Sequence, residues 1–178
     1  MAEEFLDIVS ENNELTGESA PRSKVHAEGL WHRTVHVYLF RKNNDDIDFL
    51  IHLRSPLKEH NPNKLATSFG GHIKAGETLE QGTKAELQEE IGLEIDYEKL
   101  LGGYWRKRDN PDNREQNVIY YLEFNGALED LQFNDGEVQE VKWMSVEEVK
   151  NSMRKNPKAW AGKIDGFIEK SDYLKEIL

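Results

Sequence analysis

Cysteine is absent from the 178-residue sequence, so the chain forms no disulfide, offers no thiolate to a metal and has no cysteine nucleophile. Long apolar runs are absent as well, so we expect neither a membrane span nor a signal peptide, and we expect a cytoplasmic protein. Basic residues are in the minority, with 23 Lys and Arg against 34 Asp and Glu, for a formal net charge of −11. Since nucleic acids and anionic membranes are bound by basic surfaces, this balance argues against both as partners.

What the sequence does contain is sufficient for one folded domain. Hydrophobic residues make up 37% and charged residues 32% of the chain, which is polar but not typical of disorder. A chain of this length can bury a proper core. We expect a single domain over residues 1–178, with its core at about 30–150. Residues 1–29 would form an N-terminal strand and loop extension, and residues 151–178 a C-terminal helical extension.

Hydrophobic patterning predicts an alternation of strands and helices. Residues 11–19 are rich in turn formers, and residues 22–29 fit a short helix or loop. The predicted strands cover residues 3–9, 30–40, 48–55, 100–106, 118–124 and 137–144. Helices are predicted after residue 78, from the N-cap Ser145 to about Arg154, and in the tail at 158–178. Strands that flank a central helix, with further helices after them, indicate an α+β sandwich.

The most informative stretch is residues 70–93, where a glycine-rich loop leads into a helical pattern. Apolar or small residues recur every four positions along one face of this helix, at Leu79, Thr83, Leu87 and Ile91. Another face carries Glu86, Glu89 and Glu90, whose spacing of i, i+3 and i+4 makes their side chains neighbours. Like charges so close repel one another, which raises a carboxyl pKa unless a cation lies among them. A divalent cation that prefers oxygen ligands would suit this cluster, whereas a solvated acidic face is the alternative.

The glycines before the helix let the backbone turn tightly and approach a ligand, so a loop carbonyl could join the carboxylates as a metal ligand. Loop and helix together resemble the Nudix box, G-x5-E-x7-R-E-U-x-E-E-x-G-U, in which U is aliphatic. Gly71 opens the pattern, Glu77 is its loop glutamate, and Ala85 stands in place of its arginine. The other fixed positions match, at Glu86, Leu87, Glu89, Glu90, Gly92 and Leu93. The resemblance extends over about residues 30–150 and implies the Nudix fold, a mixed β-sheet sandwiched between α-helices, here with an additional C-terminal helix.

The resemblance also implies a metal site and its ion. Enzymes with this box hydrolyse a diphosphate linkage with the help of Mg²⁺ or Mn²⁺. Glu86, Glu89 and Glu90 would bind the ion, with the Gly71 carbonyl as a further ligand, and Glu77 would orient the helix carboxylates. In the family the arginine fixes these acids by ion pairing. Alanine cannot do so, and the neighbouring Lys84 points about 100° away around the helix.

The sequence does not identify which residue is the general base. In this superfamily it comes from the box helix, here Glu89 or Glu90, or from a later loop, here Glu137 or Glu115. A loop acid without a catalytic role is the alternative for Glu137.

A finer resemblance links the strings LWHRTVHVYLF, LRSP and SFGGH to isopentenyl-diphosphate isomerase and the hydrolases related to it. The isomerase uses a cysteine two residues before the box histidine, His72, and that position is Gly70 here. The isomerases also bind a metal through histidines and glutamates outside the acidic helix. His32, His72 and Glu115 match such positions, and His26 does so loosely, which suits zinc or manganese. Hydrogen-bonded histidines of the core or of a loop are the alternative.

Substrate contacts are predicted at Arg54, with assistance from Lys58, because Arg54 matches a basic position that contacts diphosphate in the isomerase-like group. The alternative for both is a surface ion pair. Residues 104–115 concentrate basic residues, and Trp105 there offers a stacking face to an anionic substrate. A solvated hairpin loop is the competing interpretation of this segment.

The sequence therefore predicts a metal-dependent Nudix hydrolase that cleaves the diphosphate linkage of a nucleoside diphosphate-X compound or a related organic diphosphate. A Nudix domain that binds such a ligand with little or no turnover is the alternative that Ala85 favours. An isopentenyl-diphosphate isomerase is disfavoured by Gly70. The partner would be a small-molecule diphosphate, and because superfamily members are frequently dimers, a homodimer is also open.

Overall fold

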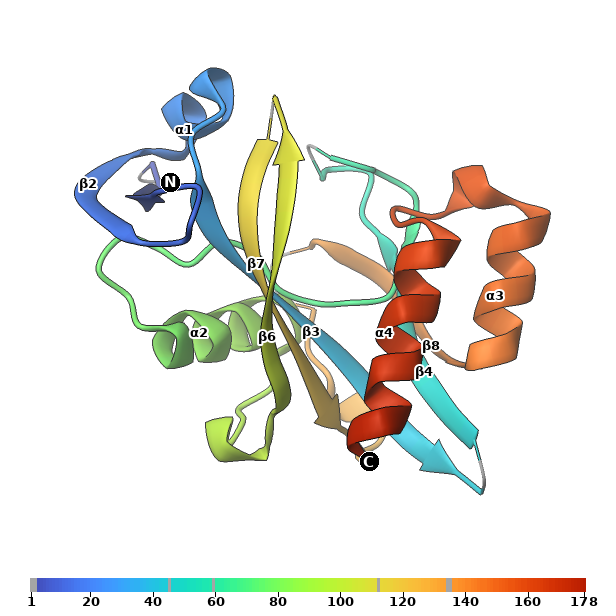
Figure 1. Ribbon diagram of the computed structural model, residues 1–178. Helices are drawn as coiled ribbons and strands as arrows, with labels where there is room; N and C mark the ends of the chain where they lie inside the picture. The colour runs from blue at the N-terminus through green and yellow to red at the C-terminus, as the bar shows by residue number, and fades with distance from the viewer. Residues whose placement is uncertain (1–2, 45, 59, 112, 134–135) are drawn as a thin grey trace.

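The computed structural model describes residues 3–178 except residues 45, 59, 112, 134 and 135. A six-stranded sheet lies between helices, with α2 on one side and α3 and α4 on the other, and a small two-stranded sheet adjoins it (Figure 1). The strands are β1 (Phe5–Val9), β2 (Leu15–Pro21), β3 (His32–Asn43), β4 (Asp46–Arg54), β5 (Leu65–Ala66), β6 (Leu101–Asn110), β7 (Asn113–Glu123) and β8 (Val138–Ser145). The helices are α1 (Arg22–Glu28), α2 (Leu79–Ile91), α3 (Val146–Lys155) and α4 (Ile164–Ile177). The expected fold, a mixed sheet between helices with an additional C-terminal helix, is confirmed.

The sheet has the strand order β5-β4-β3-β7-β6, and β8 pairs with the edge of β4 that lies opposite to β3 and β5. Its strands β3 and β7 run parallel, whereas β3 with β4 and β6 with β7 form antiparallel pairs. Within the described residues, no helix combines the length and apolarity needed to cross a bilayer.

Alternate residues of β3 serve the two faces of the sheet, because successive side chains of a strand point in opposite directions. Val35 and Val37 belong to a buried cluster that includes Leu87 and Ile91 of α2. Tyr38 and its neighbours on the other face belong to a second cluster with residues of α3 and α4. The acidic helix and the C-terminal helix are thereby held on opposite faces (Figure 1).

The box loop is part of the sheet as well. β3 pairs with β4 only over its last four residues, and the segment 69–73 runs antiparallel along the rest of it. Val37 exchanges backbone hydrogen bonds of 2.8 and 2.9 Å with Phe69, and the Val35 N–H donates to the Gly71 carbonyl at 2.9 Å. Helix α2 then begins at Thr78, whose hydroxyl forms a capping box with Gln81. A rigid strand and a capped helix therefore fix both ends of the box loop.

Three expectations about local structure need correction. Residues 15–21 form β2, where turns were expected, because pairing with β1 orders a strand that buries only Ala20. Residues 104–110 and 113–115 form strands rather than a loop, because β6 and β7 remain paired as far as Asn110 and Asn113. The C-terminal helix begins at Ile164 rather than at 158, since Pro157–Ala159 forms a separate short 3-10 helix.

Candidate metal and substrate site

Two carboxylates of α2 lie against the glycines of the box loop. The Gly70 N–H donates a hydrogen bond of 2.6 Å to Glu90, which is 3% exposed. A Cβ atom on Gly71 would stand only 2.5 Å from a carboxylate oxygen of Glu86, and one on Gly70 would stand 2.3 Å from the Val35 carbonyl oxygen. Position 70 therefore requires glycine, whereas a side chain at position 71 would have to displace the Glu86 carboxylate.

Two lysines form ion pairs with acids of the box helix. The Lys74 amine lies 3.0 and 3.2 Å from the two carboxylate oxygens of Glu89. The Lys58 amine lies 3.9 Å from Glu90 and also forms an ion pair with Glu137, which brings these predicted site residues together. The sequence analysis missed Lys74 because its partner is fifteen residues away, across the loop.

The loop glutamate Glu77 has a local role in this structure. One of its carboxylate oxygens accepts a 2.9 Å hydrogen bond from the Lys74 N–H, and the Glu77 N–H donates to the Lys74 carbonyl at 3.1 Å. Glu77 thus fixes the turn that carries Lys74 toward Glu89.

The electrostatics of Glu86 favour a cation. Burial, followed by the charge of Glu90, raises the pKa of Glu86 to about 8, and Lys74 only partly opposes this. A carboxylate that is hard to ionise because of its neighbours is stabilised when a divalent cation joins them. The donor set of Glu86, Glu89 and Glu90 consists of oxygen atoms, which suits Mg²⁺ or Mn²⁺, and so the residues present fit the ion that the family uses.

Ala85 faces away from these contacts and lines a surface hollow together with Lys84, Gln88, Glu94 and Ile95. As expected, Lys84 does not replace the missing arginine, because its amine pairs with Glu80 at 2.6 Å. The ammonium groups of Lys58 and Lys74 are the cations that contact the box acids instead.

Three histidines form a second cluster, to which α1, β3 and the box loop contribute one residue each. The nearest ring nitrogens of His26, His32 and His72 all lie within 4.8 Å of one another, and the Nε2 atoms of His26 and His72 are 3.2 Å apart. The Nδ1 atom of His32 lies 3.0 Å from the Leu30 carbonyl, while its buried Nε2 atom has no hydrogen-bond partner among the residues that the structure describes. Burial, reinforced by His32, lowers the pKa of His72 to about 2, so this ring is neutral, as a metal ligand must be.

Glu115 pairs in register with His32 but lies outside this triad. Its carboxylate contacts Arg108 at 3.3 Å and accepts a 2.7 Å hydrogen bond from the Asn113 side chain. Burial opposes its ionisation, yet His36 and Arg108 hold the pKa of Glu115 below its usual value. The three imidazoles by themselves fit zinc, whereas manganese would also need the oxygen of a carboxylate such as Glu115.

The predicted substrate residues lie on different parts of the sheet. Arg54, at the end of β4, donates a 2.9 Å hydrogen bond to the His60 carbonyl, and Glu90 partly offsets the lowering of its pKa by burial. Trp105 is 37% exposed on β6, and the Arg33 guanidinium lies 5.4 Å from the centre of its ring. Arg54 is thus close to the box acids, whereas one face of Trp105 is already occupied.

The basic segment is largely neutralised by acidic neighbours. Arg106 pairs with Glu169 at 2.8 Å, Lys107 with Glu11, Arg108 with Glu115, and Arg114 with Asp109 at 3.2 Å. These pairs do not form a continuous positive rim.

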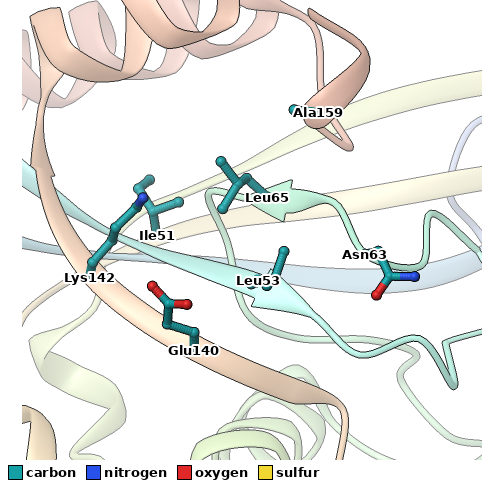
Figure 2. A pocket seen from close by; sticks show the side chains of 7 residues that line it. All are labelled: Ile51, Leu53, Asn63, Leu65, Glu140, Lys142 and Ala159. Atoms are coloured by element: carbon teal, nitrogen blue, oxygen red, sulfur yellow. The ribbon is translucent and has the colours of Figure 1, made fainter. Parts of the chain in front are cut away.

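A separate hollow lies on the sheet face that carries α3 and α4 (Figure 2). Ile51, Leu53 and Leu65 form its apolar floor, and Lys142 and Glu140 stand beside it. Ile51 of this hollow belongs to the buried cluster with residues of α3 and α4, whereas the acidic helix α2 packs in the cluster on the other face. This hollow is therefore not part of the acidic site.

A glycine loop that is held by a mixed sheet against a carboxylate-bearing helix defines a class of α+β proteins suited to binding a divalent cation and a phosphate together. The chain belongs to the NUDIX domain family, the Nudix hydrolases, whose model matches residues 30–165. Proteins of this family generally need a divalent metal cation.

Named relatives agree with the family. Nudix hydrolase 3 of Arabidopsis thaliana is 33% identical over 168 residues, which is 90% of this chain and 22% of that protein. An uncharacterised Nudix hydrolase of Listeria monocytogenes is 32% identical over 146 residues, 82% of each chain. An isopentenyl-diphosphate Delta-isomerase of Aliivibrio fischeri is 26% identical over 158 residues, 86% of this chain and 87% of the isomerase. The chain thus spans only about a fifth of the Arabidopsis relative, but most of the other two.

Solved structures share the fold. A crystal structure of a Deinococcus radiodurans protein has a TM-score of 0.70 at 24% identity and covers 94% of this chain and 99% of that one. The NUDIX domain of Shewanella oneidensis NrtR, complexed with ADP ribose, has a TM-score of 0.53 at 20% identity and covers 67% of this chain and 75% of that one.

Proposed function

We propose that this chain is a metal-dependent hydrolase that cleaves the diphosphate linkage of a nucleoside diphosphate-X compound or a related organic diphosphate. The observation that carries the proposal is the contact between Glu86, Glu90 and the glycine pair Gly70–Gly71. This contact places buried, mutually repelling carboxylates beside a backbone cradle. A bound divalent ion would polarise the phosphate and help to generate hydroxide from water at neutral pH.

The chain's own residues supply binding, positioning and proton transfer. Glu86, Glu89 and Glu90 would hold Mg²⁺ or Mn²⁺, and Gly71 keeps the space beside Glu86 open. Arg54 is close enough to Glu90 for the two charges to interact, and it would bind a phosphate of the substrate.

Glu137 is the proposed base outside the helix. Its ion pair with Lys58, whose amine also lies 3.9 Å from Glu90, holds its carboxylate near Glu90, where an attacking water would lose its proton. In the reaction, water adds to one phosphorus atom, the bond from that phosphorus to the bridging oxygen breaks, and two phosphate-bearing products leave.

The structure offers support for a hydrolase over an isomerase. A cysteine at position 70 would need a Cβ atom where the Val35 carbonyl oxygen lies 2.3 Å away, so the backbone of this loop is arranged for glycine. The Gly70 N–H instead holds Glu90.

The histidine triad is proposed as a second metal site, with His26, His32 and His72 as its protein ligands. Its ion would lie on the sheet face opposite to α2. Glu115 would act from the adjacent strand position, where Arg108 and Asn113 fix its carboxylate.

The test is phosphate release from a panel of diphosphates with Mg²⁺, with Mn²⁺ or without metal. The panel holds nucleotide sugars, dinucleoside polyphosphates, nucleoside triphosphates, prenyl diphosphates and thiamine diphosphate. ADP ribose is included because the NrtR domain binds it. We expect metal-dependent release from one class, and a loss of about 10²-fold or more in Glu90→Gln, which removes a charge at the metal.

The matched control is Glu80→Gln on the same helix, since Glu80 is exposed and pairs with Lys84. Equal activity of Glu90→Gln and the control would refute the metal-ligand assignment. Metal-dependent ligand binding without release from any compound would identify a binding domain instead.

A further inference from the structure

The sheet face opposite to α2 carries a band of polar side chains between the histidine triad and α4. In one row across the sheet, Arg106 of β6 pairs with Asn117 of β7, and Asn117 pairs with Thr34 of β3. His36 of β3 follows on the same face, and its Nδ1 atom lies 3.2 Å from the Ser68 hydroxyl. Helix α4 covers the adjoining part of this face, where its apolar residues pack (Figure 1).

Lys170 of α4 ends in this band and is only 9% exposed. Its amine donates a 2.9 Å hydrogen bond to the Gly166 carbonyl and lies 6.0 Å from the centre of the Tyr38 ring. In the part of the chain that the structure describes, no carboxylate lies within ion-pairing distance of this amine. Burial, with a contribution from Arg106, lowers the pKa of Lys170 to about 8, and Glu169 only partly opposes this.

Other buried charges in the protein are compensated. Asp48 is paired with Arg41 at 2.9 Å, Glu90 with Lys58 at 3.9 Å, and Glu115 with Arg108 at 3.3 Å. Because a buried ammonium without a paired carboxylate is costly, an anion bound from outside would stabilise Lys170.

Gly166 lies beside both the Lys170 amine and a second cation, the guanidinium of Arg106. A Cβ atom on Gly166 would stand 3.5 Å from the Lys170 amine and 3.7 Å from a guanidinium nitrogen of Arg106. Gly166 lies within a regular helix and has no positive φ, so its conformation does not require glycine, which costs about 1 kcal/mol relative to alanine there. A side chain at position 166 would therefore lie in ordinary van der Waals contact with both cations.

We propose that Lys170 and Arg106 bind a phosphate group of a small molecule beside Gly166. Arg106 already contacts Glu169, but its guanidinium has five N–H donors, so one edge can bind the carboxylate and another the phosphate. A phosphate dianion would supply the opposite charge that Lys170 lacks. The phosphate belongs either to the substrate of the hydrolase proposed above, beyond the scissile diphosphate, or to a separate effector.

The direct test is a titration of the full chain with inorganic phosphate at constant ionic strength, without divalent ions, followed by NMR of the lysine amine and arginine Nε–H signals. We expect saturable shifts of the Lys170 and Arg106 signals. Lys170→Met should weaken the response of Arg106 at least tenfold, and Gly166→Ala should weaken the responses of both while keeping both cations. Unchanged Lys170 and Arg106 signals, or shifts that grow linearly without saturation, would overturn the proposal.

Lys175→Met is the matched control, because Lys175 lies on the same helix, is exposed and pairs with Asp46 at 3.6 Å. This variant should leave the phosphate response unchanged. Since the titration needs neither metal nor turnover, its result stands even if the chain proves to be no hydrolase.

Kinetics distinguish the two sources of the phosphate. If the phosphate is part of the substrate, Lys170→Met raises KM at least tenfold for a substrate with a further phosphate and leaves KM unchanged for one without it. If it belongs to an effector, Lys170→Met leaves both KM values unchanged and abolishes the effect of added phosphate on the rate. Both sources would be contradicted if Lys170→Met left both KM values unchanged and added phosphate still changed its rate as it changes that of the unmodified protein.

Discussion

At the scale of single residues, the backbone of Gly71 lies directly against the carboxylate of Glu86, a proposed metal ligand. Its Val35 partner holds the loop to the sheet, and Glu86 occupies the space where a side chain would start. We predict that Gly71→Ala lowers turnover about 10²-fold, because the added methyl group displaces the Glu86 carboxylate by a distance on the order of 1 Å. Turnover with saturating metal and the melting temperature are the measurements.

Gly162→Ala is the control, since a Cβ atom there would meet nothing within 4 Å. It should leave both quantities unchanged. Wild-type turnover in Gly71→Ala would mean that Glu86 can move without consequence and is not a metal ligand.

Lys170 is a residue whose charge opposes folding. The folded pKa of about 8 lies below the ordinary value of 10.5, so between these values the unfolded chain binds more protons than the folded one. The free energy of unfolding therefore rises as the pH increases from about 8 to 10.5. We predict that Lys170→Met is more stable than the unmodified protein below pH 8, by on the order of 1–3 kcal/mol, and that the difference shrinks toward pH 10.5.

Urea denaturation of both proteins at pH 7, 9 and 10.5 measures this difference. The other titratable groups near Lys170 are present in both proteins, so their contributions cancel in the comparison. They are Arg106 and Tyr104 of β6, His36 and Tyr38 of β3, Tyr121 of β7, and Glu169 of α4. A difference that grows with pH would show that Lys170 is not held in its low-pKa environment.

At the scale of elements, patterning predicts those segments whose burial is periodic. Helix α2 covers Leu79–Ile91, the stretch in which apolar or small residues recur every four positions. The strand β2 shows no such pattern, since backbone pairing with β1 orders it and only one of its side chains is buried. For the same reason the outer part of β6, whose side chains are largely exposed, resembles a loop in the sequence.

The candidate site is likewise predictable only where its residues lie on one element. The three box glutamates are predictable because i, i+3 and i+4 neighbours on a helix must be close. The contact of Lys74 with Glu89 and the approach of Lys170 and Arg106 to Gly166 involve separate elements, so no local spacing reveals them. The resemblance to the isomerases located His32 and His72, whereas His26 comes from α1, outside the matched motifs.

Helix α2 and its loop also determine what the missing arginine means. Glu89 is paired with Lys74 and Glu90 with Lys58, and Ala85 faces a hollow beside Glu94. We predict that Ala85→Arg changes turnover by less than about threefold, because an exposed ion pair with Glu94 contributes little. Steady-state kinetics with Mg²⁺ are the measurement, and Ala85→Leu controls for added bulk. A tenfold rise in turnover for the arginine variant alone would show that the absent ion pair limits catalysis.

At the scale of the whole molecule, the N-terminal extension is attached to the box loop from several sides. The Gly76 N–H donates a 2.9 Å hydrogen bond to Asp7, and the Ala75 N–H donates one of 2.8 Å to the Phe5 carbonyl. The contact of His26 with His72 adds a third attachment. A metal bound by the histidine triad would therefore link the extension, the sheet and the box loop into one unit.

This linkage predicts a metal-dependent stability that is separate from catalysis. Zinc at about 100 times its dissociation constant should stabilise the chelator-treated protein by about 2.7 kcal/mol, if the unfolded chain does not bind it. For a chain of this size the melting temperature should rise by about 5–10 °C. His32→Ala should abolish the rise, since it removes one of the three ligand atoms that lie within 4.8 Å of one another. Mg²⁺, which prefers oxygen ligands, should still stabilise His32→Ala as much as the unmodified protein, because the acidic site is intact. An equal zinc-induced rise in both proteins would place the ion elsewhere and leave the triad as a structural contact between α1, β3 and the loop.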